Sequence, residues 1–159
     1  MERERFVQLV KVEQESLRRF LFAMCCGNGC DADDIAQETL MKAYLSLDKY
    51  KEKDRFGSWL IKIAHNTFLD HRRRNCPMNE LDAAERLASM SAADGKFEYQ
   101  ELHLALDKLS PKERSVILLH YMQGYSIAEI SEITDDSQSA IKKQLERGRE
   151  HLKQKMKRR

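Results

Sequence analysis

Residues 109–150 read LSPKERSVILLHYMQGYSIAEISEITDDSQSAIKKQLERGRE and hold the clearest structural signals in the chain. Two helix starts of the same kind occur in this stretch. Ser110 is followed three residues later by Glu113, and Ser126 is followed in the same way by Glu129. In such a capping box, the serine and glutamate side chains satisfy backbone N–H groups that the first helical turn leaves free. We therefore expect one helix after Ser110 and another after Ser126.

The same stretch also indicates where these helices end. Gly124 suits the left-handed residue that follows a helix, and the polar segment 134–137 separates a short second helix from a longer basic one that begins near Gln138. A short helix, a tight turn and a longer basic helix are typical of a helix-turn-helix. We expect Ala128 to let the two helices cross closely. The face of the last helix expected to be buried carries Ile141, Leu145, Gly148 and Leu152.

The outward face of the last helix is strongly basic. Residues 138–159 carry nine Lys or Arg side chains against two Glu, a balance suited to contact with phosphate, an acidic protein or an anionic membrane. Side chains of this kind also read base edges in the major groove. An alternative is a small bundle with a solvated, lysine-rich face. The candidate DNA contacts are Ser137, Gln138, Ser139, Lys142, Lys143, Glu146, Arg147 and Arg149.

Helical periodicity also runs through the first half of the chain. Apolar residues at three- and four-residue steps predict a helix that stops at 27–29, a second helix after Asp31, and a third that Ser58 caps. Only 6 Gly and 2 Pro are present among 159 residues, and β-branched residues do not cluster. An all-α fold is therefore predicted, with Asp33, Asp34 and Glu38 in the first turn of the second helix, where carboxylates suit the helix dipole.

The charge pattern divides the chain into modules. Residues 80–98 carry five acidic and two basic side chains with little amphipathic order, which favours a flexible acidic linker apart from a short helix near 80–90. We expect two small helical domains, 1–74 and 99–159, joined by the linker 75–98.

The N-terminus is charged from its second residue and shows no signal-peptide core, and no apolar run is long enough to cross a bilayer. We therefore expect a cytoplasmic protein without membrane insertion, whose cysteines are reduced. Cys25, Cys26 and Cys30 match zinc-ligand spacing poorly. A thiol- or zinc-based redox protein stays open as an alternative to small thiols near a helix end. Scattered Ser, His and Asp residues without nucleophile-base spacing predict no enzyme and no cofactor.

Three stretches, in this order and spacing, resemble the extracytoplasmic-function (ECF) class of bacterial sigma factors in the sigma-70 family. Residues 31–39 (DADDIAQET) resemble the segment that docks on core RNA polymerase. Residues 56–66 (FGSWLIKIAHN) with 70–73 (DHRR) resemble the segment that opens the promoter at the minus-10 element. Residues 109–149 resemble the domain that reads the minus-35 element.

The resemblance implies a role for each stretch. Polymerase docking would fall to Asp33, Asp34, Gln37 and Glu38, and minus-10 recognition to Phe56, Lys62, Asn66, Arg72 and Arg73. Asn66 is suited to reading a base edge and Lys62 to meeting phosphate one turn away. Trp59 fits the core better than it fits a base-stacking role. The minus-35 contacts would be those of the basic helix named above.

The sequence departs from the family where the recognition helix begins. Ser139-Ala140 stands where Gly-Thr is frequent, and Gln144 stands where an arginine is usual. DNA binding survives these changes on charge grounds, whereas the bases that are read do not follow from the resemblance. The expected partners are core RNA polymerase, promoter DNA and an anti-sigma factor. The alternative function is a stand-alone helix-turn-helix regulator that binds a duplex by itself.

Overall fold

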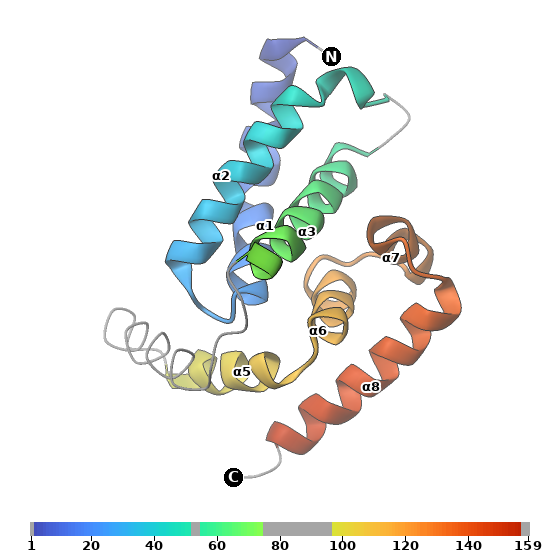
Figure 1. Ribbon diagram of the computed structural model, residues 1–159. Helices are drawn as coiled ribbons and strands as arrows, with labels where there is room; N and C mark the ends of the chain where they lie inside the picture. The colour runs from blue at the N-terminus through green and yellow to red at the C-terminus, as the bar shows by residue number, and fades with distance from the viewer. Residues whose placement is uncertain (1, 52–54, 75–96, 157–159) are drawn as a thin grey trace.

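A computed structural model describes residues 2–51, 55–74 and 97–156, and the expected linker therefore lies almost entirely outside the described residues. The regular elements in these ranges are all helical, which confirms the predicted fold class (Figure 1). None of the described helices is both long and apolar enough to cross a bilayer. The helices are α1 (Arg3–Met24), α2 (Gly29–Leu45), η1 (Leu47–Lys49), α3 (Phe56–Arg74), α5 (Phe97–Lys108), α6 (Pro111–Ile117), the π-helical turn η2 (Leu118–Met122), α7 (Ile127–Thr134) and α8 (Gln138–Met156).

Helices α1, α2 and α3 pack against one another as a three-helix bundle (Figure 1). Helix α2 begins one turn earlier than expected, because Asn28 is its N-cap and accepts a hydrogen bond from the Asp31 backbone. Asp33 and Asp34 consequently lie beyond the first turn, where they gain less from the helix dipole. Ser58 was expected to cap α3, but it lies inside that helix and donates its hydroxyl hydrogen to the Arg55 carbonyl.

The C-terminal half carries the helix-turn-helix. Both predicted capping boxes are present, at Ser110 and Ser126, and Gly124 adopts the expected left-handed conformation, with φ of 75°. The expectation for Ala128 is wrong, because its side chain is exposed. The structure shows a close approach between α8 and α6, where an added Cβ on Gly148 would stand 2.8 Å from Ile117 Cγ1.

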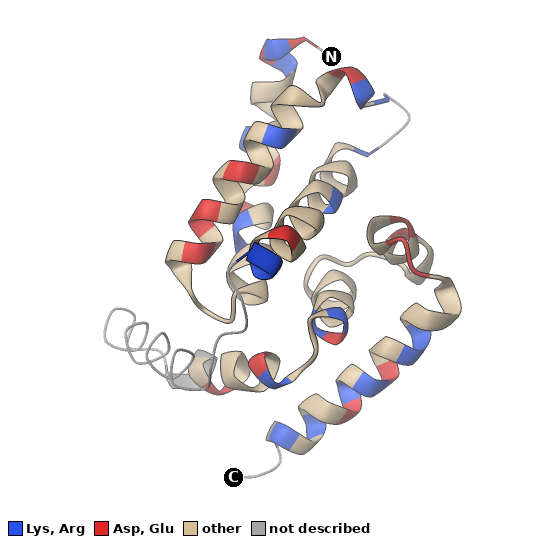
Figure 2. Ribbon diagram, in the orientation of Figure 1, with Lys and Arg blue, Asp and Glu red and all other residues tan. Residues whose placement is uncertain are grey.

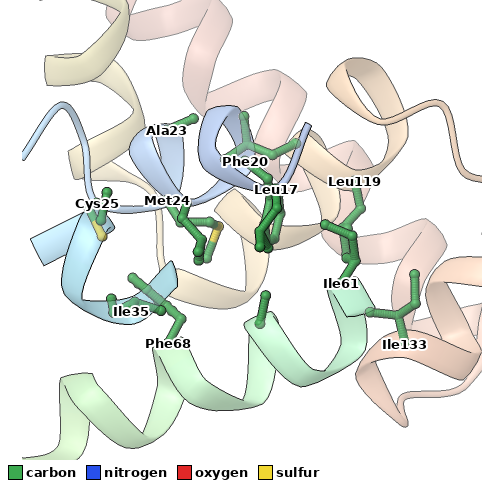
Figure 3. Close-up of a cluster of buried hydrophobic side chains, with 14 of the residues drawn as sticks. Leu17, Phe20, Ala23, Met24, Cys25, Ile35, Ile61, Phe68, Leu119 and Ile133 are labelled. Atoms are coloured by element: carbon green, nitrogen blue, oxygen red, sulfur yellow. The ribbon is translucent and has the colours of Figure 1, made fainter. Parts of the chain in front are cut away.

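The two halves share one hydrophobic core. Leu17 and Met24 of α1, Ile61 of α3, and Leu119 and Ile133 of the C-terminal half belong to the same buried cluster. Figure 3 shows Ile61 beside Leu119 and Ile133, which come from η2 and α7. Helix α3 therefore packs on α7, and α1 packs on α5, α6 and η2. The free chain thus brings its two DNA-binding candidates, α3 and α8, into one body.

Candidate nucleic-acid interface

The basic face of α8 is open to solvent along its length. Ile141, Leu145 and Gly148 are buried against the rest of the C-terminal half, and this fixes which side of the helix points outward. Lys and Arg recur along the helix in Figure 2. Every predicted duplex contact is exposed: Ser137, Gln138, Ser139, Lys142, Lys143, Glu146, Arg147 and Arg149.

Two of these side chains also have structural partners. The Ser137 hydroxyl accepts a hydrogen bond from the Ala140 backbone N–H at 3.1 Å, which makes it the N-cap of the recognition helix. Arg149 Nη1 donates to the Tyr121 hydroxyl at 3.2 Å. Ser137 therefore sets where α8 begins, and the side chains that follow it are displayed for contact.

An acidic face lies along α2, where Asp and Glu recur on the helix in Figure 2. Asp33, Asp34 and Gln37 are exposed. Glu38 differs, because both of its carboxylate oxygens accept from Arg74 at 3.1 Å and tie α2 to α3. Lys42 lies 3.6 Å from the same carboxylate. Three of the four predicted docking residues are therefore available to a partner, and the fourth also braces the bundle.

Four of the five predicted minus-10 residues divide into two groups along α3. Asn66, Arg72 and Arg73 are exposed. Lys62, which is partly buried, donates through Nζ to the Glu132 carbonyl at 3.0 Å and to Asp135 Oδ1 at 3.2 Å. Both acceptors come from the helix-turn-helix. The C-terminal end of α3 is therefore accessible, whereas the segment around Lys62 is covered by α7 and the turn after it.

Phe56 is a correction to the predicted site. Its side chain is 6% exposed and meets the Phe6 ring edge-on with centroids 6.0 Å apart. Tyr50 and Trp59 complete the aromatic cluster around it. Phe56 is hence a core residue, because its ring packs in the aromatic cluster at the start of α3 and is not exposed for stacking on a base. Trp59 is half-buried against the same rings, as expected.

A cavity of about 500 Å³ opens where α3 faces α7. Its walls carry charges of both signs: Arg55 Nη1 lies 3.2 Å from Glu129 Oε2 across it. Glu129 is also the glutamate of the α7 capping box, and its hydrogen bonds with Ser126 lower the pKa of its carboxyl. The lining residues are Arg55, Ser58, Trp59, Lys62, Glu129, Glu132 and Ile133.

A buried polar contact also joins the two halves. His65 of α3 is 5% exposed, and its Nε2 lies 3.0 Å from Ser115 Oγ of α6. Because the Ser115 hydroxyl donates to the Pro111 carbonyl at 2.8 Å, His65 Nε2–H is assigned as the donor to Ser115. Burial lowers the pKa of His65 to about 4, although Asp136 and Asp135 act in the opposite direction. The imidazole is therefore neutral at physiological pH.

Arg114 is a contact residue that the sequence analysis missed. It is 3% exposed, and its guanidinium donates to three backbone carbonyls: Leu106 at 2.9 Å, Leu109 at 3.4 Å and Met24 at 2.7 Å. These carbonyls lie at the C-terminal ends of α5 and α1, which carry partial negative charge; the Leu106 carbonyl also accepts from the Leu109 backbone N–H. Arg114 stands three and four residues before Ile117 and Leu118. This spacing places it on the same apolar helical face and could have indicated that Arg114 is buried.

The thiols lie where α1 gives way to α2. Cys25 is the C-cap of α1, and Cys25 and Cys26 are buried while Cys30 is exposed. Among the described residues, no group of three His, Cys, Asp or Glu side chains is arranged to hold a metal ion. The position at a helix end agrees with the expectation of small packing thiols.

The chain matches two family models, "Sigma-70 region 2" over residues 9–76 and "Sigma-70, region 4" over residues 99–152. It is 32% identical to the ECF RNA polymerase sigma factor SigW of Bacillus subtilis, over 98% of this chain and 90% of that protein. The chain belongs to the ECF sigma factors. It is also 31% identical to the ECF sigma factor EcfG of Rhodopseudomonas palustris, covering 86% of this chain and 77% of the relative.

Two solved structures share the fold of this sigma factor. The sigma factor RpoE of Bartonella quintana, in complex with the anti-sigma factor NepR, superimposes with a TM-score of 0.79 at 24% identity, over 98% of both chains. CnrH, in complex with the cytosolic domain of CnrY, gives a TM-score of 0.75 at 25% identity, over 98% of this chain and 90% of CnrH. The region 4 match contains the helix-turn-helix, and the region 2 match contains α3.

Proposed function

We propose that this sigma factor directs core RNA polymerase to promoters by dividing the work among three surfaces. Helix α8 reads the minus-35 duplex, the solvent-facing side of α3 holds the minus-10 strand, and the acidic face of α2 docks on polymerase. The observation that carries this assignment is the exposure of all eight predicted duplex contacts, Ser137 at the N-cap and seven on α8, opposite a face whose Ile141 and Leu145 are buried. A recognition helix needs one face packed on its own domain and the opposite face free to enter the major groove.

The proposal places the protein in the bacterial cytoplasm as a non-enzymatic subunit without a cofactor. Membership in the sigma factor family supports this, since such proteins direct a polymerase and catalyse no reaction of their own. We also propose the domains 1–74 and 99–159 with an acidic linker over 75–98, which agrees with the extents of the two family matches. An anti-sigma factor is the third proposed partner, because the sigma factor RpoE of Bartonella quintana, which shares this fold, is bound to the anti-sigma factor NepR.

Docking is tested by reversing charge on α2. Asp34→Lys with Gln37→Lys should weaken capture of core polymerase while leaving the thermal unfolding of the isolated protein unchanged, because both side chains are exposed. Like charges at a complementary interface cost several kcal/mol. Glu150→Lys, a charge reversal at an exposed position of α8, is the control. Glu38 is kept, since its replacement would also remove the contact with Arg74.

Promoter opening is tested on α3 with Asn66→Ala and Lys62→Ala. Both variants should bind core polymerase normally yet form few open complexes on a duplex promoter, because capture of an unstacked base offsets a melting cost of a few kcal/mol. A template already mismatched across the minus-10 region should restore run-off transcription. Lys11→Ala, which removes a similar charge from an exposed position of α1, should behave as the wild type. Wild-type transcription by both α3 variants on duplex templates would contradict the assignment.

A further inference from the structure

An exposed tyrosine lies beside the basic face of α8. Tyr121 belongs to the π-helical turn η2 and is 57% exposed, whereas Leu118 and Leu119 of the same turn are buried. The Tyr121 hydroxyl accepts a hydrogen bond from Arg149 Nη1 at 3.2 Å. A π-helical turn is rare and frequently occurs at functional sites. The turn after α6 therefore brings a phenol hydroxyl to one of the predicted duplex contacts.

Tyr121 holds the Arg149 side chain without cancelling its charge. Several Lys and Arg side chains elsewhere in the protein meet a carboxylate; Arg74, for example, lies 3.1 Å from Glu38 Oε2. Arg149 takes part in none of the ion pairs of the described residues, and its partner is an uncharged phenol. The contact therefore restricts the direction of the guanidinium and leaves its positive charge available to an anion.

The Tyr121 ring is itself held in place, and its hydroxyl keeps a hydrogen to donate. The His120 ring meets it edge-on, with centroids 4.9 Å apart. His120 Nδ1 lies 3.0 Å from the Tyr125 carbonyl oxygen, and because a carbonyl only accepts, Nδ1 is assigned as the donor. A tyrosine hydroxyl has one hydrogen besides its acceptor lone pairs. Among the described residues no acceptor takes this hydrogen from Tyr121, so an O–H donor stands next to the guanidinium of Arg149.

We propose that Tyr121 and Arg149 together hold one phosphate of the minus-35 duplex. Phosphate oxygens accept hydrogen bonds from both arginine and tyrosine side chains, and hydrogen bonds to a charged acceptor are the stronger ones. The proposal rests on the proposed function of α8 and adds a contact from η2, which lies outside the helix-turn-helix. Because a phosphate contact carries no base information, Tyr121 fixes how α8 sits in the groove and not which bases are read.

The contact is tested with Tyr121→Phe, which removes the hydroxyl and keeps the ring against His120. The probe is a labelled duplex that carries the minus-35 element of a promoter transcribed by the holoenzyme and ends upstream of the minus-10 element. In complex with core polymerase, the full-length variant should bind it about three- to tenfold more weakly, the range for one hydrogen bond. Tyr44→Phe, which removes the hydroxyl of another exposed tyrosine, on α2, should bind as the wild type. Thermal unfolding of the isolated Tyr121→Phe protein should be unchanged, because the contact is exposed.

Salt dependence and a double-mutant cycle separate the two groups. Tyr121→Phe changes no charge, so the slope of affinity against salt should stay close to that of the wild type, whereas Arg149→Ala should lower it by about one unit. Base preference should be the same in both variants. In an Arg149→Ala background the effect of Tyr121→Phe should fall below about twofold, because the two groups serve one phosphate. An equal effect in both backgrounds would show that they act separately and would overturn the shared site.

The phosphate is located by replacing single phosphates of the probe with neutral methylphosphonates. One replacement should weaken binding by the wild type but not by the variant that combines Tyr121→Phe with Arg149→Ala; absence of any such position would contradict the proposal. If Lys142→Ala and Lys143→Ala weaken duplex binding while Tyr121→Phe does not, the role of Tyr121 alone is wrong. If all three variants bind as the wild type does, α8 does not meet the duplex, and its proposed function fails as well.

Discussion

Helices α8 and α3 are both basic candidates for contact with DNA, yet the fold treats them differently. The predicted contacts of α8 are all exposed. On α3, Phe56 is buried in the core, Lys62 is held by α7, and Asn66, Arg72 and Arg73 are exposed. Helix α8 is exposed in the free protein, whereas α3 is partly covered by the C-terminal half, which also carries α8.

This difference separates two kinds of recognition. A duplex is read from outside by a helix whose surface is ready before the encounter. A melted strand exists only after opening, so a surface that binds it can stay covered until then. Arg114 and His65, which hold the two halves together, are therefore as relevant to function as the residues that touch DNA.

The largest expected effect comes from removing Arg114. Arg114→Leu removes the donor to three carbonyls, among them that of Met24 in the other half, although the Leu106 carbonyl keeps its hydrogen bond from the Leu109 backbone N–H. Each buried acceptor left without a partner costs about 1–3 kcal/mol, so the losses at Met24 and Leu109 should lower the free energy of unfolding by roughly 2–6 kcal/mol. Urea denaturation followed by circular dichroism measures this. Arg149→Leu, on exposed α8, should change stability by less than about 0.5 kcal/mol; equal effects would show that Arg114 is not a structural link.

Acid should weaken the link through His65. Its pKa is lowered to about 4 by burial, so the unfolded or opened state takes up the proton first as pH falls. The stability contribution is fully present above the ordinary value near 6.5, declines as pH drops towards 4, and amounts to at most about 3 kcal/mol. The difference in unfolding free energy between wild type and His65→Gln should shrink over this window. A difference that does not vary with pH would contradict the neutral, buried imidazole.

The placement of α8 is tested by Gly148→Ala. A Cβ at this position would stand 2.8 Å from Ile117 Cγ1, so α8 must shift from α6. Overpacking of this kind costs about 1–3 kcal/mol, partly offset by the better helix propensity of alanine. Thermal unfolding should show a net loss of about 1 kcal/mol, and the loss caused by Gly148→Ala should be smaller when it is measured in an Ile117→Ala background, against Ile117→Ala alone. A more stable Gly148→Ala variant would show that the helices have room to spare.

The smallest effect on stability is expected at the displayed surface. Lys142→Ala and Lys143→Ala should each change the unfolding free energy by less than about 0.5 kcal/mol, because both side chains are exposed. Each should lower the salt dependence of minus-35 duplex binding by about one unit if it contacts phosphate, or relax base preference at one position if it reads a base. Duplex titrations at several salt concentrations distinguish these outcomes. Unaltered affinity and slope in both variants would remove α8 from the interface.

Local signals in the sequence were sufficient for the helices and their caps. The capping boxes at Ser110 and Ser126 depend on residues three apart, and the left-handed end at Gly124 depends on one residue. The basic face of α8 follows from helical periodicity in the same way. Predictions failed where a local pattern fits more than one position. Serine is a favourable N-cap residue, but α3 already begins at Phe56, two residues before Ser58.

What the sequence by itself determined is thus the all-helical fold, the helix-turn-helix and the family. Only the tertiary structure decided that Phe56 belongs to the core, that Gly148 lets α8 approach α6 closely, and that Arg114 and Lys62 join the two halves. The physical reason is distance along the chain. Met24 and Arg114 lie 90 residues apart, and Lys62 and Asp135 lie 73 apart. Helical periodicity shows which face of a helix is apolar, but not which distant helix that face will meet.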